Sequence, residues 1–191
     1  MHLIIGLGNP GREYEKTRHN AGFMVIARLA ERYGLSGPKA KFHAEMLEGQ
    51  VAGMKVALLS PLTFMNRSGL TAREAANFYK LEPEQILVVV DDVALPCGRV
   101  RMRASGGAGG HNGLSDIESN LATRDYPRLR IGIDAPGRVP QSDYVLGRFS
   151  ASQLDELEPA LDRACDAIEC WLKDGIEKAM SLYNASADEE Q

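Results

Sequence analysis

The sequence predicts an α/β fold in which helices flank a mixed β-sheet, built as a single domain over residues 1–191. The length of 191 residues is typical of one domain. Short apolar runs typical of strands alternate along the chain with segments of helical periodicity, which favours an α/β arrangement. Two of the predicted strands are joined by a short turn, and such a connection requires antiparallel pairing. The sheet is therefore expected to contain both parallel and antiparallel strands.

The N-terminal part is predicted to form a strand, a loop and a helix. The strand is Leu3–Leu7, and the polar, aperiodic segment Arg12–His19 forms the loop. Asn20 can cap the helix that follows, and Gly34 ends it. The apolar stripe of this helix is predicted to consist of Phe23, Ile26, Ala27 and Ala30.

Two strands, a loop and a second helix are predicted next. The strands are Phe42–Gln50 and Met54–Ser60, on either side of a turn at residues 52 and 53. The loop is Pro61–Ser68, and the helix is Leu70–Tyr79.

A continuous aliphatic run, Ile86–Val90, indicates a strand buried on both faces, and it opens onto Asp91 and Asp92. Residues 99–104 alternate as a strand does, and a glycine-rich loop spans Ser105–Gly113. The remaining predicted elements are a helix at Leu114–Leu121, a strand at Leu129–Ile133, a long helix from the capping box at Ser150 and Gln153 to Lys173, and a shorter helix from Asp174. The C-terminal helices span about residues 150–184, and the tail at 185–191 is expected to be disordered.

The charge is unevenly distributed along the chain. Residues 150–191 carry 11 acidic and 3 basic side chains, whereas residues 1–149 carry 15 acidic and 19 basic side chains. Between Arg99 and Arg148 all eight basic residues are arginine, whose planar guanidinium suits phosphate. The pattern is compatible with a phosphate-binding face, although arginines on a protein surface often have no such role.

Several function classes find no support in the sequence. No apolar run approaches the roughly 18 residues of a membrane span, and no targeting segment is recognised, so a cytoplasmic protein is expected. Cys97, Cys165 and Cys170 lack metal-ligand spacing and are expected to be reduced, mostly packed thiols. The histidines also lack metal-ligand spacing, and no serine or cysteine stands in a nucleophile motif. Neither a metal nor a cofactor is predicted.

The segment Gly6-x-Gly8-x-x-Gly11 matches the dinucleotide-binding fingerprint after a strand. In a true dinucleotide site the third glycine lies in a helix that packs on the sheet, but here Pro10 and an aperiodic polar segment follow. A dinucleotide enzyme stays open as a weak alternative. The glycines are expected to let a loop fold tightly and to leave Asn9 displayed at the end of the first strand.

His19 is a candidate general base. It immediately precedes the predicted helix cap, where the positive end of the helix favours a neutral ring. Asp91, at the end of the buried strand, could accept a hydrogen bond from one ring nitrogen and leave the other to face a water. A structural histidine and a turn-capping carboxylate, the latter more credible for Asp92, are the alternative interpretations.

Three asparagines, Asn9, Asn66 and Asn112, stand in loops beside glycine, proline or serine. Amides can hold a water, orient a carbonyl or donate hydrogen bonds to a developing oxyanion, but turn formation alone also explains each of them. The glycine-rich loop could expose backbone N–H groups to an anion or flex over a site.

Four segments together resemble the bacterial-type peptidyl-tRNA hydrolase family. They are Gly6–Tyr14, Thr17–Gly22, Pro61–Gly69 and Gly109–Leu114, and they occur in the order and spacing of that family across essentially the whole chain. The resemblance implies a monomeric α/β protein with a twisted mixed sheet. It also implies hydrolysis, without metal or cofactor, of the ester that joins an N-blocked peptide to the 3′ end of tRNA.

The resemblance also implies roles for individual residues. His19 is similar to the catalytic base of the family, Asp91 to the carboxylate that orients it, and Asn9 and Asn112 to the amides that hold the water and the scissile carbonyl. The residues implied to contact the substrate are Tyr14, Met65, Asn66 and His111, and those implied to bind the tRNA 5′ phosphate are Arg103 and Arg130. Arginine at position 103, where the family commonly has lysine, keeps the charge but changes its geometry.

The sequence departs from the family at three positions. Val90 and Ala108 stand where the family usually has histidine, and Ala94 stands where it usually has aspartate. These changes spare the predicted base and its partner, so they bear on loop support and turnover more than on reaction type. A related group of the same fold binds RNA as a splicing cofactor without hydrolysis, and this binding function is the second hypothesis.

Overall fold

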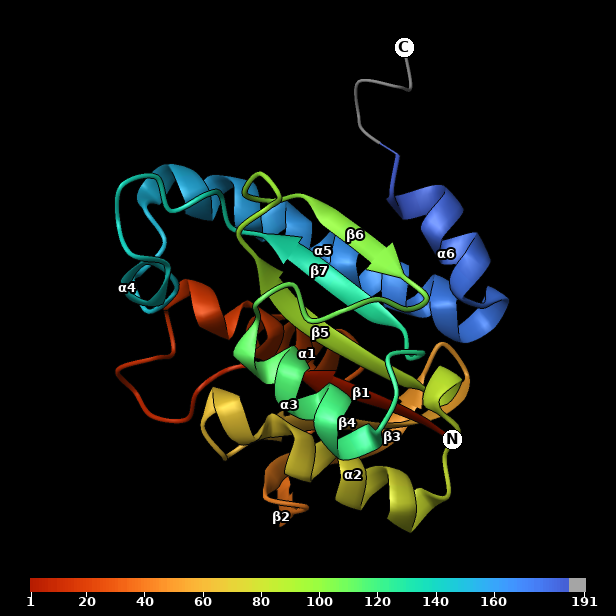
Figure 1. Cartoon of the computed structure of the whole chain (residues 1–191). Coiled ribbons are helices and arrows are strands. Elements are labelled where there is room, and N and C mark those ends of the chain that lie inside the picture. Colours follow the sequence, from red (N-terminus) through yellow and green to blue (C-terminus); the bar gives the residue numbers. More distant parts are fainter. Residues whose placement is uncertain (186–191) are drawn as a thin grey trace.

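The computed structural model describes residues 1–185 and contains one seven-stranded sheet in the order β2-β3-β4-β1-β5-β7-β6 (Figure 1). The strands are β1 (His2–Gly6), β2 (Lys39–Lys41), β3 (Ala44–Val51), β4 (Met54–Pro61), β5 (Ile86–Asp92), β6 (Val100–Arg103) and β7 (Arg128–Gly132). β4, β1, β5 and β7 run parallel, whereas β2, β3 and β6 pair antiparallel with their neighbours. The predicted mixed α/β sheet is confirmed. The tail predicted as disordered lies, from residue 186 onward, outside the described residues.

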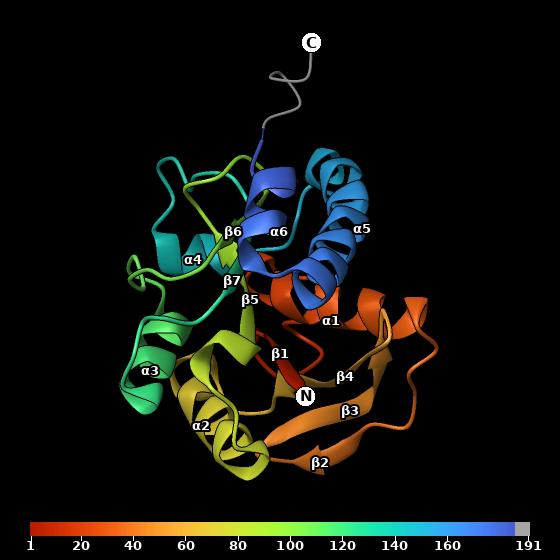
Figure 2. The same ribbon diagram turned by 90° about the vertical axis from the view of Figure 1, so that its right-hand side faces the viewer.

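Helices cover both faces of the sheet. The helices are α1 (Ala21–Arg32), α2 (Ser68–Tyr79), α3 (Asn112–Leu121), α4 (Gln141–Val145), α5 (Ala151–Asp174) and α6 (Ile176–Tyr183), with short 3-10 helices η1 (Arg18–Asn20), η2 (Met65–Arg67) and η3 (Pro83–Gln85). α2 and α3 lie on one face of the sheet, and α1 and α5 lie on the other (Figure 2). Within residues 1–185, no helix is both long and apolar enough to cross a membrane.

The central strand β5 is buried on both faces, as its aliphatic run predicts. Leu87 and Val89 belong to the core under α1 and α5, and Ile86, Val88 and Val90 belong to the core under α2 and α3. Side chains alternate along a strand. This alternation assigns Asp91 to the face covered by α1 and Asp92 to the opposite face.

Two glycines bring α1 unusually close to the sheet. A Cβ atom at Gly22 would lie 2.4 Å from the backbone nitrogen of Leu7, and one at Gly6 would lie 2.3 Å from the carbonyl oxygen of Gly22. The first glycines of the chain were predicted to serve a tight loop, but Gly6 instead permits close packing of a helix on a strand. Of Gly6, Gly8 and Gly11, only Gly11, with φ +115°, occupies a backbone conformation that favours glycine.

The predicted stripe of α1 is partly wrong. Ile26 and Ala30 are buried, but Phe23 is only half-buried and Ala27 is exposed. The buried face consists of Ala21, Gly22, Val25, Ile26, Leu29 and Ala30. Because a glycine contributes nothing to an apolar pattern, Gly22 carries no signal that it faces the sheet, and the predicted stripe lies to one side of the buried face.

Three further differences concern short segments. Phe42 and His43, predicted to begin a strand, have φ values of 53° and 55° and form the turn between β2 and β3. β2 is a three-residue strand rich in lysine, and α4 has five residues, so both are too short for a periodic signal. The predicted capping box of α5 is confirmed, with the Ser150 hydroxyl accepting from the backbone N–H of Gln153.

Candidate active site

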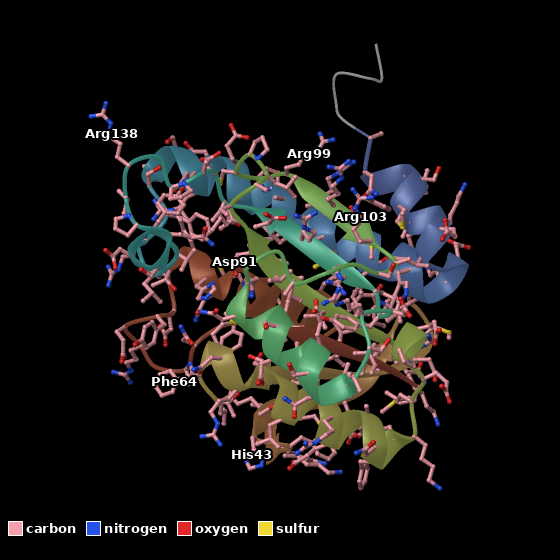
Figure 3. The ribbon with its side chains drawn as sticks, in the orientation of Figure 1. His43, Phe64, Asp91, Arg99, Arg103 and Arg138 are labelled. Atoms are coloured by element: carbon pink, nitrogen blue, oxygen red, sulfur yellow. The ribbon has the colours of Figure 1, made fainter. Side chains whose placement is uncertain are left out.

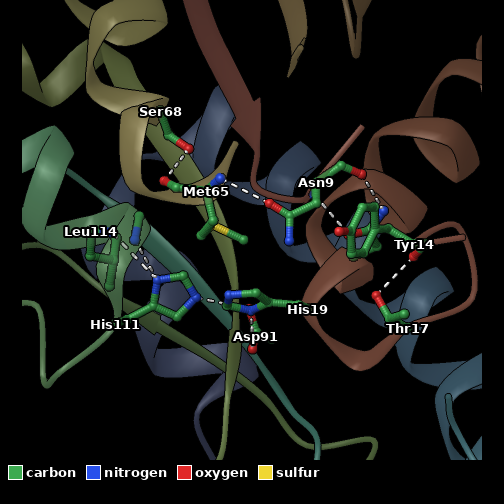
Figure 4. Close-up of polar contacts among 11 residues, drawn as sticks. Asn9, Tyr14, Thr17, His19, Met65, Ser68, Asp91, His111 and Leu114 are labelled. Carbon is green, nitrogen blue, oxygen red and sulfur yellow. Dashed lines mark hydrogen bonds and ion pairs between the residues drawn. The ribbon is translucent and has the colours of Figure 1, made fainter. Parts of the chain in front are cut away.

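His19 and Asp91 are in direct contact. His19 lies in η1, immediately before α1, and only 8% of its surface is exposed. Its Nδ1 atom is 3.0 Å from each carboxylate oxygen of Asp91, which is 4% exposed (Figure 4). The contact forms because the alternation of β5 directs Asp91 towards the face on which α1 begins.

His111 contacts the same carboxylate from the other side. Its Nε2 atom lies 2.9 Å from Oδ1 of Asp91. Its Nδ1 atom accepts hydrogen bonds from the backbone N–H groups of Gly113, at 3.1 Å, and Leu114, at 3.4 Å, at the start of α3. Because Nδ1 accepts, a neutral His111 carries its proton on Nε2 and donates it to Asp91.

The two rings hold Asp91 in its ionised form. Burial alone raises the pKa of Asp91, but the electrostatic attraction and hydrogen bond of His111, followed by those of His19, outweigh burial and lower the pKa to about 2. An ionised carboxylate can only accept a hydrogen bond, so a neutral His19 carries its proton on Nδ1. Its Nε2 atom then has a lone pair with which it can accept a proton.

The cluster fits hydrogen bonding better than metal binding. His19, Asp91 and His111 each offer a ligand atom, and these atoms lie within 4.8 Å of one another. A metal ion bound among them would need the lone pair of Nε2 in His111. That nitrogen carries the ring proton, because the backbone donors at the start of α3 already occupy Nδ1. Binding a metal would therefore break the capping hydrogen bonds of His111.

Asn9 is held in a fixed orientation beside the cluster. Its side-chain oxygen accepts from the backbone N–H of Met65 at 2.8 Å. Its amide nitrogen is left on the side that faces His19 (Figure 4). Met65 itself is buried in the core under α2 and α3, so the backbone N–H that it donates to Asn9 is held in a fixed position.

Asn20 does not cap α1 with its side chain, contrary to the sequence prediction. Its amide instead bonds to the backbone of Asn9 on both sides, accepting from N at 2.9 Å and donating to O at 3.0 Å. A capping residue needs extended backbone angles, whereas Asn20 has φ −93° and ψ 12° because η1 leads directly into the helix. The role of Asn20 in holding Asn9 was missed by sequence reasoning.

The cluster lies at one end of a cleft of about 460 Å³. Asn112, the exposed first residue of α3, lines the same cleft, and Arg103 and Arg130 line it further along the sheet. Asp91 and Arg103 both line this cleft, and their side chains are labelled in Figure 3. Other walls of the cleft include the glycine-rich residues 105–110 and three residues of α4: Gln141, Ser142 and Val145.

Three of the four predicted substrate contacts, Tyr14, Met65 and Asn66, do not line this cleft, whereas His111 does. Asn66 is exposed in η2, next to Met65, and Tyr14 is half-buried on the Asn9 side of the site (Figure 4). Asn9 also borders a second cleft of about 550 Å³, whose walls include Phe23, Leu47 and Leu62.

Four arginines share one face of the antiparallel strand pair β6 and β7. Arg101 pairs in register with Arg130, and Arg103 pairs with Arg128. The opposite face carries core residues such as Met102 and Leu129. Sequence reasoning selected only Arg103 and Arg130, although the Arg-x-Arg spacing in both strands is a signal for all four.

The arginines differ in how far they are already engaged. Arg128 is buried over the ring of Tyr126, 4.4 Å from its centroid, and donates to the carbonyl oxygens of Gly107 and Arg124. Arg130 forms an ion pair with Asp92. Asp92 also accepts from the backbone N–H of Ala94 at 2.8 Å, which confirms its predicted role in a turn. Arg103 is exposed, and its guanidinium is therefore the more available to a ligand.

The departures from the family pattern lie around the cluster. Val90 is buried in the core under α2 and α3, and Ala108 lines the cleft.

The three cysteines are free, with Cys165 and Cys170 buried and Cys97 half-buried, as predicted.

This fold and this site are typical of a hydrolytic α/β enzyme, and comparison with known proteins gives the family. A family model described as "Peptidyl-tRNA hydrolase" matches residues 3–191. A protein named peptidyl-tRNA hydrolase from Rhodopirellula baltica is 50% identical over 188 residues, which cover 98% of this chain and 99% of that protein. A protein of the same name from Carboxydothermus hydrogenoformans is 48% identical over 184 residues, which cover 96% of this chain and 98% of that protein.

The fold agrees with a solved structure. The crystal structure of peptidyl-tRNA hydrolase from Acinetobacter baumannii matches with a TM-score of 0.91 at 40% identity, and the match covers 97% of this chain and 95% of that one. The chain belongs to the peptidyl-tRNA hydrolase family. Membership confirms the resemblance, the fold and the enzyme class that the sequence predicted, an ester hydrolase.

Proposed function

We propose that this protein hydrolyses the ester bond between an N-blocked peptide and the 3′ end of tRNA, with His19 as general base. Family membership supports the reaction type. The observation that carries the mechanism is the 3.0 Å contact between Nδ1 of His19 and Asp91, which leaves Nε2 free to accept a proton.

In the proposed reaction, Nε2 of His19 takes a proton from a water whose oxygen attacks the ester carbonyl. The tetrahedral intermediate carries its negative charge on the former carbonyl oxygen, to which Asn9 and Asn112 donate hydrogen bonds. Collapse breaks the bond to the 3′ oxygen of tRNA, and His19 returns its proton to that oxygen. General-base catalysis contributes about 10²–10⁴-fold and one oxyanion donor about 10²–10³-fold, which suffices for a large acceleration.

The arginine-lined cleft is proposed to receive the tRNA. Arg103 and Arg130 are the candidate phosphate contacts, and Arg103 should contribute more because Asp92 already offsets the charge of Arg130. A guanidinium binds phosphate through two parallel hydrogen bonds, so its geometry as well as its charge matters.

The peptide is proposed to lie on the Asn9 side of the site, near Tyr14, Met65 and Asn66, where the second cleft opens. His111 is the fourth candidate substrate contact. Both of its ring nitrogens are engaged within the protein, so a substrate would meet its ring face. A monomeric state, independence of metal and cofactors, and a cytoplasmic location belong to the same proposal.

An ester-release assay tests the reaction directly. Labelled N-acetyl-aminoacyl-tRNA is incubated with the protein, and the label is followed from the tRNA into acid-soluble product. The proposal predicts release of free N-acetyl amino acid and intact tRNA. The alternative of a non-catalytic RNA-binding protein predicts binding with the label retained, and that result would contradict the proposal.

A further inference from the structure

Arg18 precedes the candidate base, but its side chain leads away from the cleft. The Nε and NH2 atoms of Arg18 donate to the side-chain oxygen of Gln153 in α5 at 3.1 and 3.0 Å. The NH1 atom donates to the carbonyl oxygen of Tyr144 in α4 at 3.0 Å. The guanidinium also stacks on the Tyr144 ring, 4.0 Å from the centroid. One side chain thus joins η1 to two helices more than 120 residues away in sequence.

Gln153 is fully engaged in this cluster. It is only 9% exposed, and its amide nitrogen donates to Oδ2 of Asp134 at 2.9 Å, to the hydroxyl of Tyr144 at 3.1 Å and to the carbonyl oxygen of Ile133 at 3.2 Å. A buried amide whose donors and acceptor are all used has one orientation. The acceptor that Gln153 presents to Arg18 is therefore fixed in space.

The backbone reinforces the same connection. The N–H of Arg18 donates to the carbonyl oxygen of Gly147 at 2.9 Å, and Thr17 forms an isolated antiparallel bridge with Arg148. A Cβ atom at Gly147 would lie 2.7 Å from NH1 of Arg18, so glycine makes room for the guanidinium. The segment that carries His19 is thereby held against residues 147 and 148.

From this arrangement we infer that Arg18 is a positioning residue for His19, and that it ties the base to the α4 wall of the arginine-lined cleft. The inference rests on the proposed function. Asp91 holds the ring of His19, but η1 is a single turn, and Arg18 fixes the backbone from which the ring projects. The same guanidinium holds α4, whose Gln141, Ser142 and Val145 line the cleft.

The expected consequence is an effect on the reaction step rather than on substrate binding. A misplacement of about 1 Å by a residue outside the chemistry can cost about 10²-fold in rate. Loss of Arg18 frees the backbone from which the ring of His19 projects, so the ring no longer keeps one position against Asp91. The water and the ester carbonyl then no longer meet Nε2 at a fixed distance.

The test compares Arg18→Met with Arg18→Lys and with the control Arg28→Met. Arg28 also joins α1 to α5, through Glu158 and Asp162, but it lines neither of the two clefts. Measurements are kcat and KM for labelled N-acetyl-aminoacyl-tRNA, and the ¹⁵N spectrum of the His19 ring, which reports the nitrogen that carries the proton. Tyr144→Phe, which keeps the stacked ring but removes the hydroxyl, is a milder second variant in case Arg18→Met does not fold.

We expect Arg18→Met to lower kcat by roughly 10- to 100-fold with KM within about 3-fold of wild type, and to change the His19 ring signals. Arg18→Lys should recover part of kcat, and Arg28→Met should match wild type in both measurements. The inference is overturned if kcat is unchanged, if only KM changes, if the His19 signals are unaffected, or if Arg28→Met gives the same loss. A wild-type protein without ester release would refute the proposed function, while the ring spectra would still test the positioning role.

Discussion

The carboxyl end of β5 and the paired strands β6 and β7 line one cleft but differ in how their charged groups are partnered. At β5 the Asp91 carboxylate is buried and contacts two histidine rings. On β6 and β7, Arg103 is exposed and Arg130 is paired with a single carboxylate. A buried charge needs partners within the protein, whereas an exposed charge is solvated by water and remains available to a ligand. Under the proposed function, the first region carries out chemistry at a fixed position and the second binds tRNA electrostatically.

The largest expected effect comes from breaking the buried region at Asp91. Asp91→Asn keeps the shape but supplies an amide that no longer selects the Nδ1-protonated form of His19. We expect the rate of ester release to fall by about 10³–10⁴-fold, because an orienting carboxylate beside a catalytic histidine has an effect of that order. Binding of deacylated tRNA, measured in parallel, should stay near that of wild type. Ester release within a few-fold of wild type would show that Asp91 is not needed to orient the base.

The exposed region should respond in the opposite manner. Arg103→Gln is expected to weaken tRNA binding and to reduce the slope of log K against log salt by about 1, since one phosphate contact is lost. Hydrolysis of a minimal ester without tRNA should survive. Arg130→Gln is the matched variant, and its effect should be smaller because Asp92 already offsets its charge. If both variants reduce hydrolysis of the minimal ester as much as that of the tRNA substrate, the two regions are not separate in function.

Acid should destabilise the protein partly through the buried region. The pKa of Asp91 is lowered to about 2 in the folded state, below the ordinary value of 3.8. A carboxyl with a lowered pKa stabilises the fold above its ordinary pKa, and this contribution is lost as the pH falls through the folded value. We expect about 2 kcal/mol of the free energy of unfolding to disappear between roughly pH 4 and pH 2.

Chemical denaturation at a series of pH values measures this loss. The difference between wild type and Asp91→Asn is the informative quantity, because other carboxyl groups titrate in both proteins. That difference should shrink as the pH falls from 4 to 2. A difference independent of pH would mean that the histidines do not hold Asp91 ionised.

The smallest effect is expected at the surface ion pairs between α1 and α5. Arg28 reaches Glu158 and Asp162, and Arg32 reaches Asp166 and Glu169. Arg28 and Glu169 are half-buried, and the other four residues are exposed. Exposed ion pairs contribute about 0–1 kcal/mol each. Arg32→Met should therefore lower the free energy of unfolding by about 1 kcal/mol or less and leave ester release unchanged, as measured by urea denaturation and the release assay. A larger loss would identify this network as a structural element in its own right.

The fold and the central contact could be predicted from sequence because both follow from local patterns. The predicted strand is buried on both faces and ends in Asp91, and the predicted helix begins just after His19. The end of the strand and the start of the helix therefore bring these two side chains to the same place. The contacts that could not be predicted depend on the paths of loops. The contact of His111 with Asp91 requires the glycine-rich loop to return to β5, and nothing in that loop's composition encodes its path.

Other features could not be predicted from the sequence because one residue type can play more than one structural role. Asn20 has a typical capping residue's identity but holds the backbone of Asn9. Arg128 shares the Arg-x-Arg spacing of its neighbours but is buried on Tyr126. Spacing indicates the face of a strand on which a side chain lies, whereas its partners depend on packing over long sequence distances.

The central claim is that Nε2 of His19 activates the water, and single-turnover hydrolysis by wild type and His19→Ala tests it most directly. With enzyme in excess over labelled N-acetyl-aminoacyl-tRNA, the observed rate reports the reaction step once binding is saturated. We predict that His19→Ala folds, binds tRNA as wild type does, and loses ester release by about 10³–10⁴-fold, at least as large a loss as that of Asp91→Asn. Equal single-turnover rates for the two proteins would contradict the account.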